Sequence, residues 1–173
     1  MSLSQPQTVL RPPTPNDGAP VFRLIGRCPP LDINSMYCNL LQCTHFAGTS
    51  VVAVQTANTN DELVGIISAY LIPEHEDTLF IWQVAVDECA RGIGLAGNML
   101  EHILDRPQCS QITYLETTIT ESNKASWALF ESLANKLGAS LEKSVMFDCA
   151  KHLASEHDTE FLARIGPFKF AQT

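Results

Sequence analysis

A glycine-rich turn, Arg91-Gly92-Ile93-Gly94-Leu95-Ala96, lies between an apolar run typical of a strand, residues 80–86, and one typical of a helix, residues 93–104. The first turn of a helix has backbone N–H groups without partners inside the helix, and the helix dipole places partial positive charge there. Both effects favour a phosphate. The turn therefore predicts a site for the pyrophosphate of a cofactor.

The glycine spacing also matches the fingerprint of dinucleotide-binding folds. Gly92, Gly94 and Gly97 spell G-x-G-x-x-G, and Glu116 follows about 20 residues later, as that fingerprint requires. However, residues 87–91 separate the strand from the first glycine, and the turn lies in the middle of the chain. The fingerprint belongs in the first βαβ unit of a parallel sheet, so another pattern must explain this turn.

A shorter pattern fits the turn and its context. Arg91-x-x-Gly94-x-Ala96 resembles the (Arg/Gln)-x-x-Gly-x-(Gly/Ala) signature of the GNAT superfamily of N-acetyltransferases. A strand precedes it, a helix and a strand follow, and Asn123 then leads a second helix. The resemblance implies that Arg91, Gly92, Ile93, Gly94, Leu95 and Ala96 bind the pyrophosphate of acetyl-CoA, with Asn123 also at the cofactor.

The bulk composition limits the class of function. The chain has 173 residues, which suits one domain, expected over residues 7–173 after a disordered tail at residues 1–6. Its 11 basic and 19 acidic residues give a net charge of −8, which argues against a nucleic-acid partner. No apolar run reaches the roughly 18 residues of a membrane span, and the N-terminus does not resemble a signal peptide. We therefore expect a cytoplasmic protein.

The cysteines and histidines do not predict a metal site. Six cysteines are scattered without paired spacing, and without a secretion signal they are expected to be buried, reduced thiols. His152 and His157 are five residues apart, which does not place two ligands on one helix face. We expect no metal.

The periodicity predicts an α/β (α+β) fold. The expected strands and helices follow the order β-α-α-β-β-β-α-β-α-β-β. Short turns between successive strands imply antiparallel pairs. This is the order of the GNAT-like fold, which has a mixed, mostly antiparallel central sheet with helices on both faces. Strands are expected at residues 8–11, 50–56, 63–72, 78–86, 112–118, 144–148 and 160–165, and helices from Asn16 or Asp17, over 35–45, 93–104 and 123–137.

The GNAT resemblance also implies how the donor is held. In that superfamily two parallel strands splay apart, which here are residues 78–86 and 112–118, and the pantetheine arm pairs with the first of them. Val84, Ala85 and Val86 would make those main-chain bonds, and a backbone N–H at Val84 would polarise the thioester carbonyl. The alternative is that these three residues are plain strand core.

Proton transfer departs from the superfamily pattern. The tyrosine that usually protonates the departing thiolate corresponds to Phe130, which cannot donate a proton. The proton would come from water or another group, for which Tyr114 is a weak candidate. Glu116, near the end of the second splayed strand, can accept the proton of the amine or merely bind a cation.

Longer segments resemble one family within the superfamily. Residues 30–38 (PLDINSMYC), 80–86 (FIWQVAV), 114–120 (YLETTIT) and 164–167 (RIGP) are similar to the L-2,4-diaminobutyrate acetyltransferases, and the resemblance runs from about Thr8 to Pro167. That family acetylates the γ-amino group of diaminobutyrate, an early step of ectoine biosynthesis. The resemblance therefore implies a small diamino acid as substrate, and superfamily members often form homodimers.

Diaminobutyrate carries two ammonium groups and one carboxylate, so acidic side chains are the expected ligands. The candidates are Asp32, Glu116, Asp158 and Glu160, with Trp82 packing on the carbon chain or on an ammonium. Each has a plainer explanation, because Asp32 can cap a helix, Trp82 can belong to the core, and Asp158 and Glu160 can lie in a solvated loop. Arg164 is a candidate for the substrate carboxylate or a surface residue.

Three functions remain at this point. The first is acetylation of diaminobutyrate, and the second is acetylation of another small amine or of a peptide N-terminus. The third is a non-catalytic acyl-CoA-binding domain, which the phenylalanine at position 130 favours.

Overall fold

The computed structural model describes residues 7–57 and 60–170. It contains two compact units. The first comprises the described residues up to Ala69 together with Gln83–Ile103, and the second comprises Tyr70–Trp82 and the described residues from Leu104 onwards. The chain passes between the units at three points, two inside strands and one inside the helix that ends at Leu104, so the predicted extent of one domain over residues 7–173 stays a prediction.

The order of the elements confirms the predicted order, with one short helix added near the C-terminus. The elements are β1 (Gln7–Arg11), α1 (Gly18–Gly26), α2 (Met36–His45), β2 (Val51–Ala57), β3 (Asn60–Ile72), β4 (His75–Val86), α3 (Leu95–Leu104), β5 (Tyr114–Thr120), α4 (Lys124–Leu137), β6 (Leu141–Phe147), α5 (Cys149–His152) and β7 (Glu160–Ile165).

The sheet is mixed and mostly antiparallel, as predicted. Its seven strands are hydrogen-bonded in the order β1-β2-β3-β4-β5-β7-β6. The parallel pair is β4 and β5, whose register joins Thr78–Ile81 to Tyr114–Thr117. Beyond these residues β4 continues to Val86 and β5 to Thr120, as expected of a parallel pair that splays.

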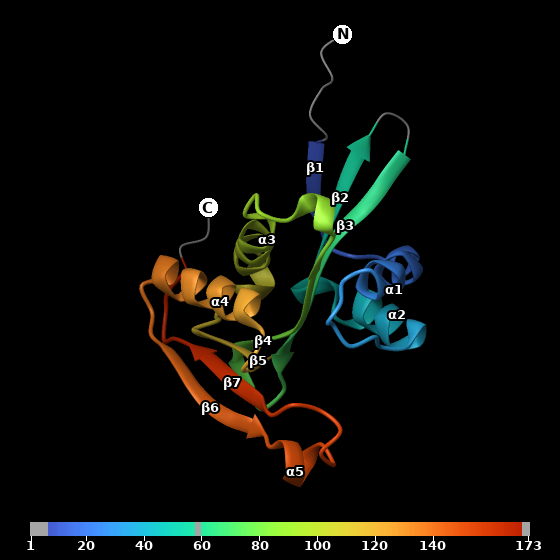
Figure 1. The fold of residues 1–173 in the computed structure, drawn as a ribbon. Helices are drawn as coiled ribbons and strands as arrows, with labels where there is room; N and C mark the ends of the chain where they lie inside the picture. The colour runs from blue at the N-terminus through green and yellow to red at the C-terminus, as the bar shows by residue number, and fades with distance from the viewer. Residues whose placement is uncertain (1–6, 58–59, 171–173) are drawn as a thin grey trace. The chain divides into compact units, whose positions relative to one another are not determined.

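The first unit packs helices on both faces of its strands (Figure 1). A buried cluster joins α1 and α2 to one face, through residues that include Val21, Leu24, Val52, Ile66 and Ala85. Alternate residues point to the other face, because side chains of a strand alternate between its faces. There Gly65 lies against α3, since a Cβ at Gly65 would be 3.0 Å from the Sδ of Met99.

A bulge interrupts the pairing of β2 with β3. Ala53 pairs with Gly65 and Val54 pairs with Leu63, so Val64 is the extra residue. Gly65 lies directly beside this extra residue, and a glycine inside a strand often marks a bulge. The carbonyl of Val64 accepts a hydrogen bond from the N–H of Asp87 at 2.8 Å, which ties the bulge to the residue that follows β4.

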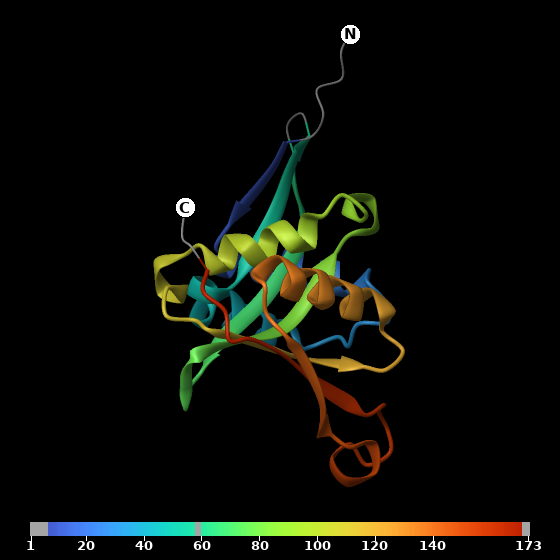
Figure 2. The same ribbon diagram turned by 90° about the vertical axis from the view of Figure 1, so that its left-hand side faces the viewer.

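The second unit covers one face of its strands with α4, and its C-terminal β6–β7 hairpin carries α5 at the tip (Figure 2). Phe130, Leu133 and Ala134 are the buried residues of α4. Strand residues such as Leu115 and Ile165 are fully buried. Glu116 and Arg164 immediately neighbour those two residues, so the alternation of a strand turns their side chains to the opposite face.

Several predicted boundaries were wrong by a few residues. Ser35, not Asp32 or Asn34, caps α2, because its side chain accepts a hydrogen bond from the N–H of Cys38. The glycine turn extends to Gly94, so α3 begins at Leu95 instead of Ile93, and β4 begins at His75 inside the predicted turn. The predicted tail at residues 1–6 and the middle of the turn at 58–59 lie outside the described residues.

Candidate functional site

The glycine turn before α3 has the backbone conformation that its sequence requires. Gly92 and Gly94 have φ angles of +77° and +76°, which residues with a Cβ rarely adopt. No heavy atom lies within 4 Å of a Cβ built at either position, so open space surrounds the turn. The turn therefore presents accessible backbone at the N-terminus of α3, where the helix dipole favours an anion.

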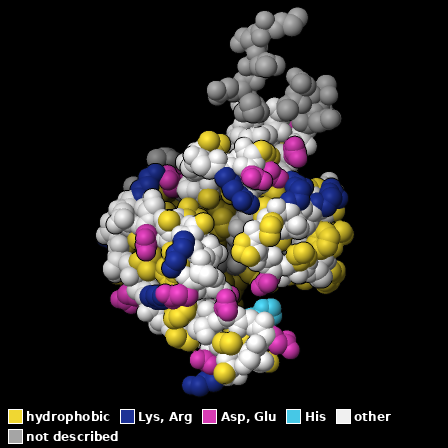
Figure 3. Space-filling model, in the orientation of Figure 1, with side chains coloured by type: hydrophobic (Ala, Val, Ile, Leu, Met, Phe, Trp, Pro, Cys, Tyr) yellow, Lys and Arg dark blue, Asp and Glu magenta, His cyan; other side chains and the backbone are white. Residues whose placement is uncertain are grey.

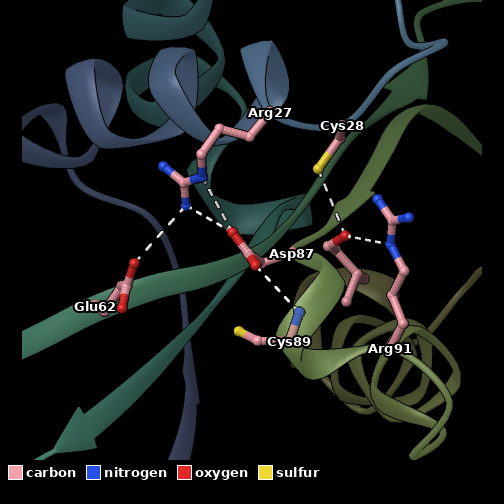
Figure 4. A network of polar contacts seen from close by, with 7 residues as sticks. Arg27, Cys28, Glu62, Asp87, Cys89 and Arg91 are labelled. Atoms are coloured by element: carbon pink, nitrogen blue, oxygen red, sulfur yellow. Dashed lines mark hydrogen bonds and ion pairs between the residues drawn. The ribbon is translucent and has the colours of Figure 1, made fainter.

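A polar network holds the start of this turn against the end of β4 (Figure 4). The Nε of Arg91 donates to the carbonyl oxygen of Val86 at 2.9 Å. The Sγ of Cys28 donates to the same oxygen at 3.5 Å. The signature arginine thus fixes the turn to the strand through its Nε, and the carbonyl of Val86 is occupied by two donors.

Asp87 completes the network from the first residue after β4 (Figure 4). Its Oδ2 accepts from Nε and Nη2 of Arg27 at 3.1 and 2.7 Å, and its Oδ1 accepts from the N–H of Cys89 at 3.2 Å. The hydrogen bond from Arg27 lowers the pKa of Asp87 below its ordinary value, although partial burial opposes the shift. The ionised carboxylate therefore connects α1 to the turn that leads to Arg91.

The other residues predicted for the donor lie at the end of β4 and at the start of α4. Ala85 is buried against α1 and α2, so its side chain serves the core, whereas Val84 and Val86 are half-buried. Asn123 accepts a hydrogen bond from the N–H of Ser126 at 3.1 Å and is the N-cap of α4. A capping role for Asn123 is therefore visible, and a role at the cofactor stays a prediction.

Glu116 lies in a row of side chains on the face of the second unit's strands opposite the buried Leu115. It is 7% exposed, and its Oε1 accepts from Nη1 of Arg164 at 2.5 Å. The guanidinium of Arg164 stacks on the ring of Tyr114 at 4.1 Å from its centroid. Phe80 pairs with Glu116 in the register of β4 and β5. The predicted acid is thus buried, ion-paired and beside an aromatic side chain.

Two further aromatic side chains extend this row. The ring of Tyr70 lies 5.3 Å from that of Phe80 and 6.3 Å, edge-on, from that of Trp82. Burial raises the pKa of Tyr70, and the charge of Glu116 raises it further. Trp82 is 43% exposed, which rules out the core role that its sequence position left open. An acid beside three aromatic rings suits a cationic ligand.

The remaining predicted acids lie in the loop between α5 and β7 and at the first residue of β7. Asp158 is exposed, and Glu160 is half-buried at the start of β7, where it pairs with Thr120. The loop between α5 and β7 contains two non-glycine residues with positive φ, Ala154 at 54° and Ser155 at 60°. Such residues cost free energy and are concentrated at functional sites, so this loop stays a candidate.

Asp32 belongs to the loop between α1 and α2 in the first unit. Its side chain is exposed, and its carbonyl oxygen accepts a hydrogen bond from the side chain of Gln83 at 3.1 Å. Because Ser35 caps α2, the capping explanation for Asp32 no longer holds. Exposed hydrophobic side chains appear over the α1 and α2 part of this unit (Figure 3), and those of the same loop and of the first turn of α2 are Ile33, Met36 and Tyr37.

Sequence reasoning missed Tyr70, Phe80 and Gln83 as residues of interest. Tyr70 and Phe80 meet their partners through the register of neighbouring strands, and Gln83 meets Asp32 and Asn34 in a loop about 50 residues away. Among the described residues no group of three or more His, Cys, Asp or Glu side chains could hold a metal ion. No helix in the described ranges has the length and apolar character needed to cross a membrane.

Comparison with known proteins places this geometry in a family. The Acetyltransferase (GNAT) family matches residues 21–134. The L-2,4-diaminobutyric acid acetyltransferase of Methylotuvimicrobium alcaliphilum is 56% identical over 167 residues, which cover 96% of this chain and 95% of the relative. The enzyme of the same name from Vibrio cholerae is 50% identical over 157 residues, 91% of this chain and 88% of the relative.

A solved structure agrees with these relatives. The diaminobutyrate acetyltransferase EctA from Paenibacillus lautus, in complex with L-2,4-diaminobutyric acid and coenzyme A, superposes with a TM-score of 0.88 at 33% identity, over 96% of this chain and 99% of that chain. The NatC complex bound to Gag peptide and CoA has a TM-score of 0.73 at 20% identity, which shows a shared fold only. The chain therefore belongs to the acetyltransferase (GNAT) family, and within it to the L-2,4-diaminobutyric acid acetyltransferases.

Proposed function

We propose that this protein transfers an acetyl group from acetyl-CoA to the γ-amino group of L-2,4-diaminobutyrate, an early step of ectoine biosynthesis. The observation that carries the proposal is the likeness, along nearly the whole chain, to an enzyme solved with diaminobutyrate and coenzyme A. The identity of 45–56% to several relatives with that name supports the same substrate.

The cofactor binds at the end of β4 and at the start of α3. The pyrophosphate lies against the backbone of residues 91–96, where Gly92 and Gly94 allow close approach and the helix dipole adds to the attraction. The pantetheine arm pairs with the backbone at Val84 and Ala85. The carbonyl of Val86 already accepts from Arg91 and Cys28, so Val86 offers its N–H instead.

The acceptor is held by acids and aromatic rings. An ammonium group of diaminobutyrate lies near Glu116 and against the faces of Trp82 and Tyr70, which stabilise a cation together. Asp32 supplies a second carboxylate, and Asp158 and Glu160 are further ligands for an ammonium. Arg164 neutralises part of the charge of Glu116, and the same guanidinium is a candidate partner for the substrate carboxylate.

The reaction forms one N–C bond and breaks one C–S bond. The γ-ammonium first gives up a proton to Glu116 or to water, and the neutral amine attacks the carbonyl carbon of the thioester. The backbone N–H of Val84 stabilises the oxyanion that develops. The C–S bond then breaks, the attacking nitrogen releases its second proton to water, and the thiolate takes a proton from water or from another group. Phe130 is 2% exposed within the core and does not supply it.

A turnover assay tests the proposal. Purified protein is supplied with acetyl-CoA and, in separate reactions, diaminobutyrate, ornithine, lysine or a short peptide, and release of free coenzyme A is measured. We expect the highest kcat/KM with diaminobutyrate, and NMR of the product should place the acetyl group on Nγ. Faster turnover of another amine would contradict the substrate, and acetyl-CoA binding without thiol release from any amine would favour a non-catalytic domain.

The assembly and the location belong to the same proposal. A homodimer is supported by the exposed apolar residues Val145, Met146 and Phe147 on β6, the last strand in the sheet order. Light scattering of the eluted protein tests it, and a monomer mass at micromolar concentration would contradict it. The reaction draws on acetyl-CoA and a free amino acid, and we place it in the cytoplasm, with residues 7–173 acting as one catalytic domain.

A further inference from the structure

Gln83 holds two residues of the loop that carries Asp32. Its Nε2 donates to the carbonyl oxygen of Asp32 at 3.1 Å, and its Oε1 accepts from Nδ2 of Asn34 at 3.2 Å. The loop residues are 51 and 49 positions away in the chain, so these bonds are tertiary contacts. Gln83 is 9% exposed, and burial makes both bonds costly to lose.

The two hydrogen bonds need an amide at position 83. A carboxylate can accept from Asn34 but cannot donate to the carbonyl of Asp32, and an apolar side chain can do neither. Between the two bonded residues, Ile33 is 63% exposed and does not anchor the loop through burial. Other attachments that flank this segment include the N–H of Leu31, bonded to the carbonyl of Cys28, the packing of Leu31 against the buried cluster, and the cap at Ser35.

The position of Gln83 on β4 connects this loop to the donor. The next residue in the strand is Val84, whose backbone contacts the thioester in the function proposed above. Asp32 and Val84 are therefore joined by one side chain and one peptide unit, all within the first unit. A fixed path of this length can set where the carboxylate of Asp32 lies relative to the reacting carbonyl.

We propose that Gln83 is a positioning residue, which clamps the loop at Asp32 and Asn34 and thereby orients the Asp32 carboxylate toward an ammonium group of the acceptor. The inference rests on the proposed function for the identity of that acceptor. The clamp itself concerns the loop alone and has a readout that does not depend on activity.

The first test measures KM for diaminobutyrate and KM for acetyl-CoA separately in each variant. In Gln83→Leu we expect KM for diaminobutyrate to rise about tenfold, the effect of losing two hydrogen bonds, with KM for acetyl-CoA unchanged. Asn34→Ala removes one of the bonds and should give a smaller rise. Gln55→Leu is the matched control, because Gln55 is also a strand glutamine and its Nε2 donates to the hydroxyl of Thr8 at 3.3 Å. The control should have the same KM for diaminobutyrate as the unmodified protein.

A double variant sharpens the test. If Gln83 and Asn34 act through one clamp, KM for diaminobutyrate should be no higher in the double variant Gln83→Leu with Asn34→Ala than in Gln83→Leu alone. The effects of substituting two residues in direct contact are generally not additive. Effects that multiply, or equal rises in KM for both substrates, would overturn the proposal.

Hydrogen exchange supplies the readout that is independent of catalysis. Amides of residues 31–34 should exchange faster in Gln83→Leu than in the unmodified protein. In Gln55→Leu their exchange rates should equal those of the unmodified protein. Unchanged exchange in a folded Gln83→Leu would overturn the clamp, and if that variant does not fold, Asn34→Ala decides by the same measurement. Failure of the unmodified protein to acetylate diaminobutyrate would end the proposed function, whereas the exchange result would still decide whether Gln83 holds the loop.

Discussion

In the proposed function, Glu116 is the acidic residue on which handling of the amine depends most. It is buried and bonded to Arg164, while the edge of the same row is open at the half-exposed Trp82. A buried, paired carboxylate is an effective anchor for a second cation, and it can also relay a proton through water. Which of these roles dominates is visible in kinetics, because an anchor acts on KM and a base acts on kcat.

The substitution Glu116→Gln keeps the shape of this side chain and removes its charge. We expect kcat/KM for diaminobutyrate to fall about 100-fold, the lower range for a general base, with KM for acetyl-CoA unchanged. Glu121→Gln is the control, since Glu121 is an exposed carboxylate paired with Lys143 at the surface. A loss confined to KM would identify an anchor, and unchanged kcat/KM would remove Glu116 from the site.

Gly94 offers a test of the pyrophosphate site at the same scale. Gly94→Glu places a side chain at φ +76° and a negative charge beside the anion, so KM for acetyl-CoA should rise at least about tenfold. Gly97→Ala is the matched control within α3, where a Cβ meets no atom within 4 Å. It should retain cofactor binding and gain about 0.5–1 kcal/mol in helix stability. Equal cofactor binding by both variants would mean that the phosphate lies elsewhere.

At the scale of elements, the helix ends explain where sequence reasoning succeeded. A helix was predicted over residues 123–137, and the structure has Asn123 as N-cap and Gly138, with φ +62°, as C-cap of α4. The start of α2 was predicted to within one residue but its cap was not, because three cap-forming residues, Asp32, Asn34 and Ser35, lie within four positions. Local propensity is nearly equal for all three, and tertiary contacts of the loop select Ser35.

Asn123 allows its two candidate roles to be separated. Asn123→Ala removes the cap of α4 and should lower the free energy of unfolding by about 1 kcal/mol, whereas Asn123→Ser keeps a capping oxygen and should retain it. Denaturant unfolding measures the stability, and KM for acetyl-CoA measures any role at the cofactor. If the serine variant is stable but binds acetyl-CoA poorly, Asn123 also contacts the cofactor, whereas equal stability of alanine and serine would contradict the cap.

At the scale of the whole molecule, the fold was predictable and much of the acceptor site was not. The order of strands and helices was predicted from periodicity, and the glycine turn was predicted from the pattern of Arg91, Gly94 and Ala96. The row of Tyr70, Phe80 and Glu116 depends on the register of three strands, which periodicity leaves open. The pairing of Glu116 with Arg164 likewise comes from the register of β5 with β7.

The acid stability of the whole chain depends in part on Asp17. Burial alone would raise its pKa, but hydrogen bonds from Arg11 and Thr14 outweigh burial, and the pKa of Asp17 is lowered from 3.8. The stabilisation is therefore present above pH 3.8 and is lost as the pH falls through the lower pKa of the folded state.

Asp17→Asn tests this linkage. We expect the variant to be less stable by about 2 kcal/mol near neutral pH, because Arg11 loses a charged partner that is mostly buried. The difference from the unmodified protein should shrink below pH 3.8, as measured by urea unfolding across a pH series. Arg11→Gln should show the same convergence at low pH, and a difference that stays constant with pH would contradict the assignment.

The carbonyl of Val86, occupied by Arg91 and Cys28, has a consequence for any extended chain that adds to the end of β4. On that edge of β4 the carbonyl before that of Val86 belongs to Val84, since successive residues of a strand point their backbone groups to opposite edges, and such a chain finds no free acceptor beyond Val84. The amides of the incoming chain therefore cannot move further along β4, and the ligand and the strand have a single register. In the proposed function, the protein thereby fixes how far the acetyl group extends along the strand before the amine binds.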